Sequence, residues 1–138
     1  VNNYFIIGKV NEGKSHLFNL FSKSHKTISN PKENTTVDII KKNILSEQFE
    51  YNIYDTPGFY KFNDFSILLK KILELKLDNI CFIYLTSLFT NEDSKICKKI
   101  HNQKFKLYLF SFKNIDEDSV ISNLFNEVFI NHSDNTYF

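Results

Sequence analysis

Arginine, tryptophan and methionine do not occur in this chain, and glycine, proline and cysteine are rare. Because all 17 cations are lysine, the chain can supply no arginine finger of its own. Cys81 and Cys97 lie far apart and outside any CxxC pattern, which predicts two reduced, buried thiols in a cytoplasmic protein. No apolar run reaches the roughly 18 residues of a membrane span, so we expect no membrane segment.

Charge and size narrow the possible classes further. The net charge is +1, from 17 cations and 16 anions spread along the chain, so no direct nucleic-acid patch is expected. With 138 residues, 42% of them hydrophobic, the chain can form one domain with a packed core but not two. Because the chain starts at Val1 rather than at methionine, we expect a fragment of a longer protein.

Strand-like apolar segments alternate with segments of helical spacing. Strands are predicted over 4–7, 37–45, 47–55, 79–85, 106–112 and 127–130, and helices over 16–21, 65–77, 91–102 and 117–126. Asn91 is the expected N-cap of the third helix. This alternation predicts an α/β fold with a mostly parallel six-stranded sheet and one antiparallel edge strand.

The stretch GKVNEGKS (residues 8–15) lies between the first predicted strand and the first predicted helix. This is the arrangement of a phosphate-binding P-loop, in which Gly8 and Gly13 let backbone N–H groups approach phosphate oxygens. Lys14 would place its ammonium between the β- and γ-phosphates, and Ser15 would bind Mg²⁺ at the start of the helix. The motif therefore predicts a three-layer P-loop NTPase.

Two further segments fit the same chemistry. Asp55 opens DTPG (residues 55–58) after a predicted strand, where an aspartate would contact Mg²⁺ and Gly58 could offer its N–H to the γ-phosphate. By itself DTPG could be an ordinary turn. Thr36, within NTTVD, lies between the first helix and the strand pair, where a threonine would complete the Mg²⁺ shell while triphosphate is bound.

With these motifs the chain resembles the TrmE–Era–EngA group of GTPases, and most of all the first G domain of Der (EngA). That family reads G-R-P-N-V-G-K-S-T-L-F-N, then a switch ending in T-R-D, then D-T-x-G; the counterparts here are GKVNEGKSHLFN, TVD at 36–38 and DTPG. The acidic helix that starts with TNED at 90–93 is also similar. The resemblance implies GTP and GDP as ligands, Mg²⁺ as cofactor, and the large ribosomal subunit as partner.

The resemblance also bears on hydrolysis. Phe59 stands where Ras-like enzymes carry a glutamine that orients the attacking water, and phenylalanine cannot do so. Several family members use K⁺ instead, held partly by the asparagine that matches Asn11. Asn11, Lys14, Thr36 and Gly58 are accordingly the expected catalytic residues, although Asn11 could serve only to stabilise the loop.

The guanine-recognition motif departs from the family pattern. The family reads N-K-x-D, whereas this chain reads KNID at 113–116. Asp116 keeps its place and could select guanine, or it could only cap the next helix. Asn114 lacks the long aliphatic stem that a lysine would lay on the base, and Lys113 cannot accept hydrogen bonds as an amide would. We therefore expect weaker base binding.

These motifs define the predicted site and two classes of function. The metal ligands are Ser15, Thr36 and Asp55, and the nucleotide-binding residues are Gly8, Lys9, Val10, Asn11, Glu12, Gly13, Lys14, Ser15, His16, Asp55, Thr56, Pro57, Gly58, Lys113, Asn114 and Asp116. We expect a single G domain over 1–138, truncated before its final helix, that hydrolyses GTP as a switch. The alternatives are a degenerate nucleotide-binding module without efficient turnover, or the cytosolic G domain of a FeoB-type iron transporter.

Overall fold

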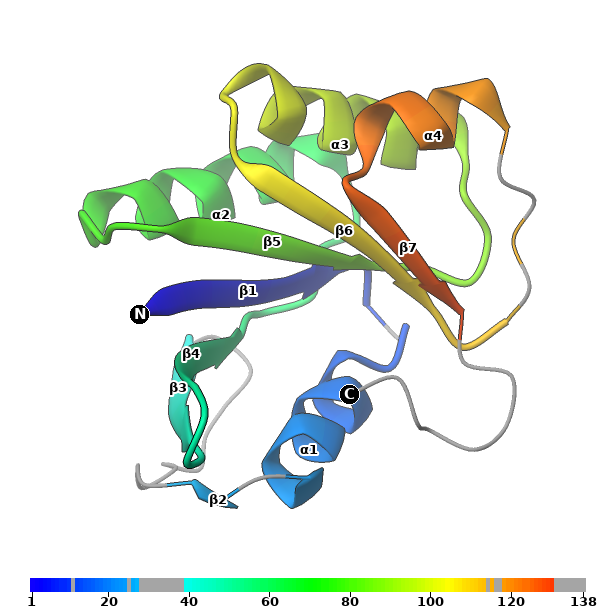
Figure 1. Ribbon diagram of the computed structural model, residues 1–138. Helices are drawn as coiled ribbons and strands as arrows, with labels where there is room; N and C mark the ends of the chain where they lie inside the picture. Colours follow the sequence, from blue (N-terminus) through cyan, green and yellow to red (C-terminus); the bar gives the residue numbers. More distant parts are fainter. Residues whose placement is uncertain (11, 25, 28–38, 114, 116–117, 131–138) are drawn as a thin grey trace.

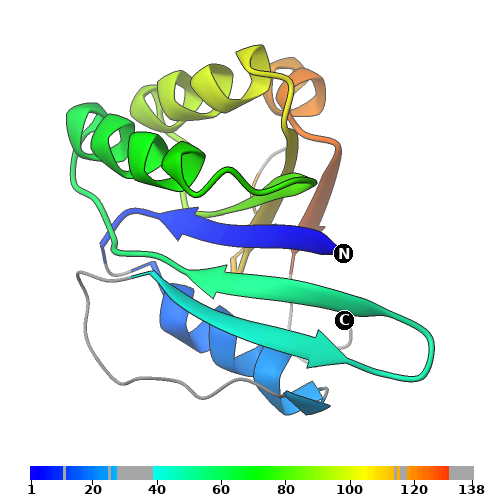
Figure 2. The ribbon, with the colours of Figure 1, turned by 90° about the vertical axis from the view of Figure 1, so that its left-hand side faces the viewer.

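The computed structural model describes residues 1–10, 12–24, 26–27, 39–113, 115 and 118–130. Its strands are β1 (Asn2–Gly8), β2 (Lys26–Thr27), β3 (Ile40–Leu45), β4 (Glu50–Asp55), β5 (Ile80–Leu85), β6 (Lys106–Ser111) and β7 (Glu127–Ile130). Its helices are α1 (Lys14–Ser24), α2 (Phe62–Glu74), α3 (Asn91–Asn102) and α4 (Ser119–Leu124). Helices α2, α3 and α4 cover one face of the sheet, and α1 lies on the other (Figures 1 and 2).

The sheet has the order β2-β3-β4-β1-β5-β6-β7. Strand β1 pairs in parallel with β4 and β5, and β5, β6 and β7 continue in parallel, whereas β3 is antiparallel to β4. The predicted α/β fold with six mostly parallel strands is therefore confirmed. The two-residue strand β2, which the sequence analysis did not predict, pairs with the end of β3 and lies outside it.

The central strands carry apolar residues on both faces, as parallel strands covered by helices must. In β5, Phe82 and Tyr84 belong to the core under α2, α3 and α4, whereas Ile83 and Leu85 belong to the core under α1. In β1, Phe5 and Ile6 divide between these two cores in the same way. The period of two along each strand thus builds two hydrophobic layers, one on each side of the sheet.

Two helix N-caps differ from the predicted ones for a reason of local hydrogen bonding. Thr90, and not Asn91, is the N-cap of α3, because its side chain accepts from the N–H of Asp93 while the Asp93 carboxylate accepts from the N–H of Thr90. Asp118 caps α4 by accepting from Val120 and from the next residue. Asp118 is therefore the N-cap of α4 in place of the alternative, Asp116, which lies outside the described residues.

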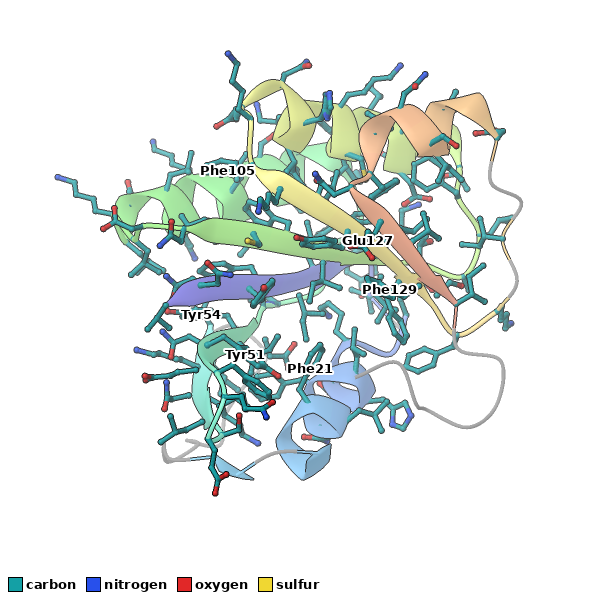
Figure 3. The ribbon with its side chains drawn as sticks, viewed as in Figure 1. Phe21, Tyr51, Tyr54, Phe105, Glu127 and Phe129 are labelled. Atoms are coloured by element: carbon teal, nitrogen blue, oxygen red, sulfur yellow. The ribbon has the colours of Figure 1, made fainter. Side chains whose placement is uncertain are left out.

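An apolar cleft of ≈ 460 Å³ lies on the α1 face of the sheet. Phe21, Tyr51 and Phe129 are among the residues that line it (Figure 3). Residues 131–138, which follow β7, lie outside the described part of the chain. Among the described helices, none has both the length and the apolar character needed to cross a bilayer.

Candidate nucleotide-binding site

The predicted P-loop connects the end of β1 to the start of α1, at the carboxyl-terminal ends of the parallel strands (Figure 1). Gly13 has φ +92°, a conformation that a side chain would strain. Gly8 is needed for a different reason: a Cβ there would lie 2.7 Å from the carbonyl oxygen of Leu85 in the neighbouring strand β5. The two glycines that the motif singles out thus serve loop geometry in one case and strand packing in the other.

A cavity of ≈ 670 Å³ lies over the P-loop. The P-loop and the DTPG segment supply its walls, which are formed by Val10, Gly13, Lys14, Ser15, His16, Gly58 and Tyr60. Six of these residues were predicted to bind nucleotide. Tyr60 was not, and its position two residues after DTPG is the only signal that could have suggested it. The smaller, apolar cleft on the α1 face carries none of the predicted site residues.

The floor of this site consists of Lys14 and Ser15, which line the cavity, and of Asp55, which contacts Ser15 from the end of β4. The hydroxyl of Ser15 donates to Oδ2 of Asp55 over 3.2 Å. Burial lowers the pKa of Lys14, and the nearby Asp55 carboxylate only partly opposes that shift. Burial likewise raises the pKa of Asp55, against the opposing effects of Lys14, the Ser15 hydroxyl, the Thr56 backbone and Lys42. Both groups are therefore held in a partly dehydrated position that favours a bound counter-charge.

The donor set of this floor fits Mg²⁺. Oδ1 of Asp55 is buried and has no hydrogen-bond partner among the described residues. Ser15 adds a hydroxyl oxygen beside the same carboxylate. Hard oxygen ligands of this kind are those that Mg²⁺ takes, with water and phosphate oxygens completing its octahedron. The third predicted ligand, Thr36, lies outside the described residues.

The DTPG segment is joined to the P-loop by its backbone. The N–H of Val10 donates to the carbonyl of Phe59 over 3.0 Å, and the N–H of Phe59 donates to the carbonyl of Gly8 over 3.4 Å. A Cβ on Gly58 would lie 3.0 Å from Cα of Val10 and 3.1 Å from Nζ of Lys14. The hydroxyl of Thr56 donates to the carbonyl of Ile6 in β1, and Thr56 does not line the cavity.

Phe59 has its side chain in the core and not in the cavity. Its ring is 2% exposed and packs against the rings of Phe65 and Tyr84, with centroids 5.5 and 6.5 Å away. No group at this position can therefore orient an attacking water, as the sequence indicates.

Two predicted binding residues of the P-loop turn their side chains away from the cavity. Nζ of Lys9 lies 3.3 Å from a carboxylate oxygen of Asp93 in α3. Oε1 of Glu12 accepts from the N–H of Ser87, in the loop after β5. Neither side chain lines the cavity, so these residues could contact phosphate only through their backbone.

The predicted base-recognition segment is described only in part. The hydroxyl of Ser111 accepts from the N–H of Lys113 and donates to its carbonyl, which closes a tight turn after β6. Phe112 packs against the ring of His16, with centroids 5.1 Å apart, so this turn adjoins the start of α1. Asn114 and Asp116 lie outside the described residues, as does Asn11.

The crystal structure of the G domain of the T. maritima FeoB iron transporter resembles this chain with a TM-score of 0.65. The likeness covers 93% of this chain and 86% of that one at 20% sequence identity, so it shows the fold alone. A structure of the cytosolic domain of L. pneumophila FeoB matches with a TM-score of 0.58 at 18% identity, over 80% of this chain and 50% of that chain.

Among curated proteins, the tRNA modification GTPase MnmE of Prochlorococcus marinus (strain MIT 9312) is 35% identical over 124 residues. That match covers 86% of this chain and 27% of the relative. MnmE of Brachyspira hyodysenteriae (strain ATCC 49526 / WA1) is 30% identical over 119 residues, or 82% of this chain and 26% of the relative. The chain thus spans about a quarter of the length of these relatives. Residues 3–113 match the family model described as "50S ribosome-binding GTPase". With its P-loop, its Asp55 floor and this match in agreement, the chain belongs to that GTPase family.

Proposed function

We propose that this chain binds GTP with Mg²⁺ and hydrolyses it to GDP and phosphate as a conformational switch. The observation that carries the proposal is the floor of the site. Lys14 and Ser15 line the cavity there, and beside Ser15 lies Asp55, one of whose oxygens has no hydrogen-bond partner among the described residues. A cation, a magnesium-binding oxygen pair and a concave loop of amides are the parts that phosphoryl transfer needs.

Each residue has a distinct task in this mechanism. The ammonium of Lys14 lies between the β- and γ-phosphate oxygens and offsets the charge that grows as the bond to the γ-phosphate breaks. Ser15 and Asp55 would hold Mg²⁺, directly or through water, and would thereby bring its positive charge to the same phosphates. Thr36 would complete that shell, and the N–H of Gly58 would donate to the γ-phosphate. Loss of the γ-phosphate releases Gly58 and Thr36, which is the switch.

Hydrolysis is fastest with one more positive charge near the γ-phosphate, where charge grows in the transition state. The chain has no arginine to supply that charge, and the side chain of Phe59 is buried and apolar. A K⁺ ion held partly by Asn11 is the proposed substitute. We expect phosphate release to be faster in K⁺ than in Na⁺ at equal ionic strength, and Asn11→Ala to remove that difference. Equal rates of the wild-type chain in the two salts would contradict the role of Asn11.

A nucleotide titration tests the proposal against the degenerate module. Fluorescent analogues of GTP, GDP and ATP are added with and without Mg²⁺, and Lys14→Ala is the control that should not bind. Micromolar binding of guanine nucleotides alone supports the switch and the role of Asp116. Equal binding of ATP removes that role and favours the degenerate module, in which Lys113 and Asn114 no longer support base selection. Binding without phosphate release would favour the same alternative.

The proposed setting is a longer cytoplasmic protein that acts on RNA, of which residues 1–138 form a single G domain. Two partners have separate support. The description of the matching family and the likeness to the first G domain of Der favour the large ribosomal subunit, whereas the names of the curated relatives favour a tRNA-modifying protein. Co-sedimentation of the full-length protein with ribosomal subunits or with tRNA, in GTP and in GDP, distinguishes the two candidate partners.

A further inference from the structure

Asp93 is the most completely buried charged side chain near the P-loop, with an exposure of 0%. One of its carboxylate oxygens accepts from the N–H and the hydroxyl of Thr90, over 2.8 and 2.9 Å. The other accepts from the hydroxyl of Tyr84 and lies 3.3 Å from Nζ of Lys9. A buried carboxylate with this many donors is held in one place, because losing any of them would leave charge without compensation.

Lys9 brings the P-loop into this arrangement. It directly follows Gly8 at the end of β1, and its side chain is only 25% exposed. Besides Asp93, its ammonium lies 3.4 Å from the hydroxyl of Thr90. A lysine committed to a buried carboxylate is not available to phosphate, so its effect on the loop must come through the position of its backbone.

The first turn of α3 and the loop before it also form hydrogen bonds with Glu12 of the P-loop and with the start of α2. The N–H of Ser87 donates to Oε1 of Glu12, so the P-loop is attached at a second point. Oε2 of Glu92 accepts from the N–H of Phe62, at the start of α2 after the DTPG segment. The Tyr84 ring, whose hydroxyl reaches Asp93, also packs against Phe59. The P-loop and the DTPG segment therefore share one anchor.

We propose that Asp93 and Lys9 are positioning residues for the reaction: their ion pair fixes the first residues of the P-loop to the N-terminus of α3, and thereby sets the cradle that receives the phosphates. The inference rests on the nucleotide site proposed above. It assigns Lys9 to the scaffold instead of the ligand, and it gives the acidic first turn of α3 a role beyond helix capping.

Two measurements on four variants test this inference. Lys9→Met removes the charge at a partly exposed position, Lys9→Arg keeps it, and Asp93→Asn removes the partner charge while keeping the carbonyl acceptor. Asp118→Asn is the matched control, because it makes the same change at the N-terminus of another helix, α4. The measurements are amide hydrogen exchange over residues 8–16 without nucleotide, and the release rate of a fluorescent GDP analogue.

Lys9→Met and Asp93→Asn should each speed GDP release about tenfold, which is the effect expected from losing one charged hydrogen bond. Each should also raise amide hydrogen exchange over residues 8–16. Lys9→Arg and Asp118→Asn should behave as the wild type does. The double variant should release GDP no faster than either single variant, because both remove the same contact. Exchange over residues outside the P-loop reports whether a variant has lost its fold instead.

The inference is overturned if Lys9→Met shows wild-type exchange and release, or if Lys9→Arg is as impaired as Lys9→Met. Lys9→Met keeps the test decisive even if Asp93→Asn fails to fold, since Lys9 is not fully buried. The exchange measurement needs no nucleotide, so it still decides the role of the ion pair if the wild-type chain were to bind no GDP. That last result would count against the proposed function alone.

Discussion

Gly8 illustrates how a motif residue can matter for two reasons at once. The P-loop pattern explains it by proximity to phosphate, whereas the structure places the carbonyl of Leu85 against it. A backbone oxygen in the middle of a sheet cannot move aside as a flexible side chain can. The residue is therefore required by the packing of β1 on β5, whether or not nucleotide is bound.

Gly8→Ala should lower the free energy of unfolding by about 1–3 kcal/mol, the usual cost of forcing an extra carbon into a filled space. Urea unfolding followed by circular dichroism measures this change without nucleotide. Asn19→Ala, on the exposed face of α1, is the control and should change the free energy by less than about 0.5 kcal/mol. An unchanged midpoint for Gly8→Ala would show that β1 and β5 can separate enough to admit a Cβ.

The pKa of Lys14 leads to a prediction on pH. Burial lowers this pKa from 10.5 in the nucleotide-free chain, so the ammonium loses its proton at a lower pH than a free lysine does. The affinity for magnesium tripolyphosphate, which lacks a titrating base, should accordingly fall as pH rises, beginning below 10.5. Lys14→Arg keeps its charge throughout and should show no such fall, even if it binds less tightly. Calorimetric titrations between pH 7 and about 10 would detect the difference, and a flat wild-type profile would contradict it.

At the scale of single elements, the helices are defined by their caps more than by their apolar spacing. The apolar spacing predicted α2 over 65–77, but the helix begins at Phe62 and ends at Glu74. Asp64 accepts from the N–H groups of Tyr60 and Lys61 and so extends the helix toward the site. A cap depends on one or two hydrogen bonds, and sequence spacing alone does not locate such bonds.

Asp118→Ala should lower the free energy of unfolding by about 1 kcal/mol, because two N–H groups of α4 lose their acceptor. Thermal or urea unfolding measures the loss. Lys98→Ala, at an exposed position of α3, controls for a general effect of substitution by alanine. If both variants had the same stability as the wild type, α4 would not depend on its cap.

At the scale of the whole molecule, stability should fall at alkaline pH through the buried tyrosines. Burial, with a smaller effect of Tyr4, raises the pKa of Tyr51 to about 12. A folded-state pKa above the unfolded value of about 10 means that this contribution is complete below pH 10 and is lost as pH rises toward 12. Urea unfolding at several pH values should show this fall, and Tyr51→Phe should make it less steep. An equally steep fall in Tyr51→Phe would assign it to other groups.

The sequence alone predicted the six main strands, the four helices and the P-loop, because each depends on residues close together in the chain. Alternation of period two and of period 3.6 is a local signal, and GKVNEGKS is one continuous stretch. Asp55 could also be placed, since it ends a strand beside the loop. The short strand β2 was missed because two residues carry no periodic pattern.

The amino-acid sequence by itself thus determined the layered α/β fold and the contiguous phosphate-binding loop of this GTPase domain. Only the tertiary structure decided where the loop's side chains turn: Lys9 to Asp93, Glu12 to Ser87, and Phe59 into the core. The physical reason is distance along the chain. Lys9 and Asp93 meet only when β1 and β5 pair and bring α3 to the end of the sheet, and no local pattern encodes that meeting.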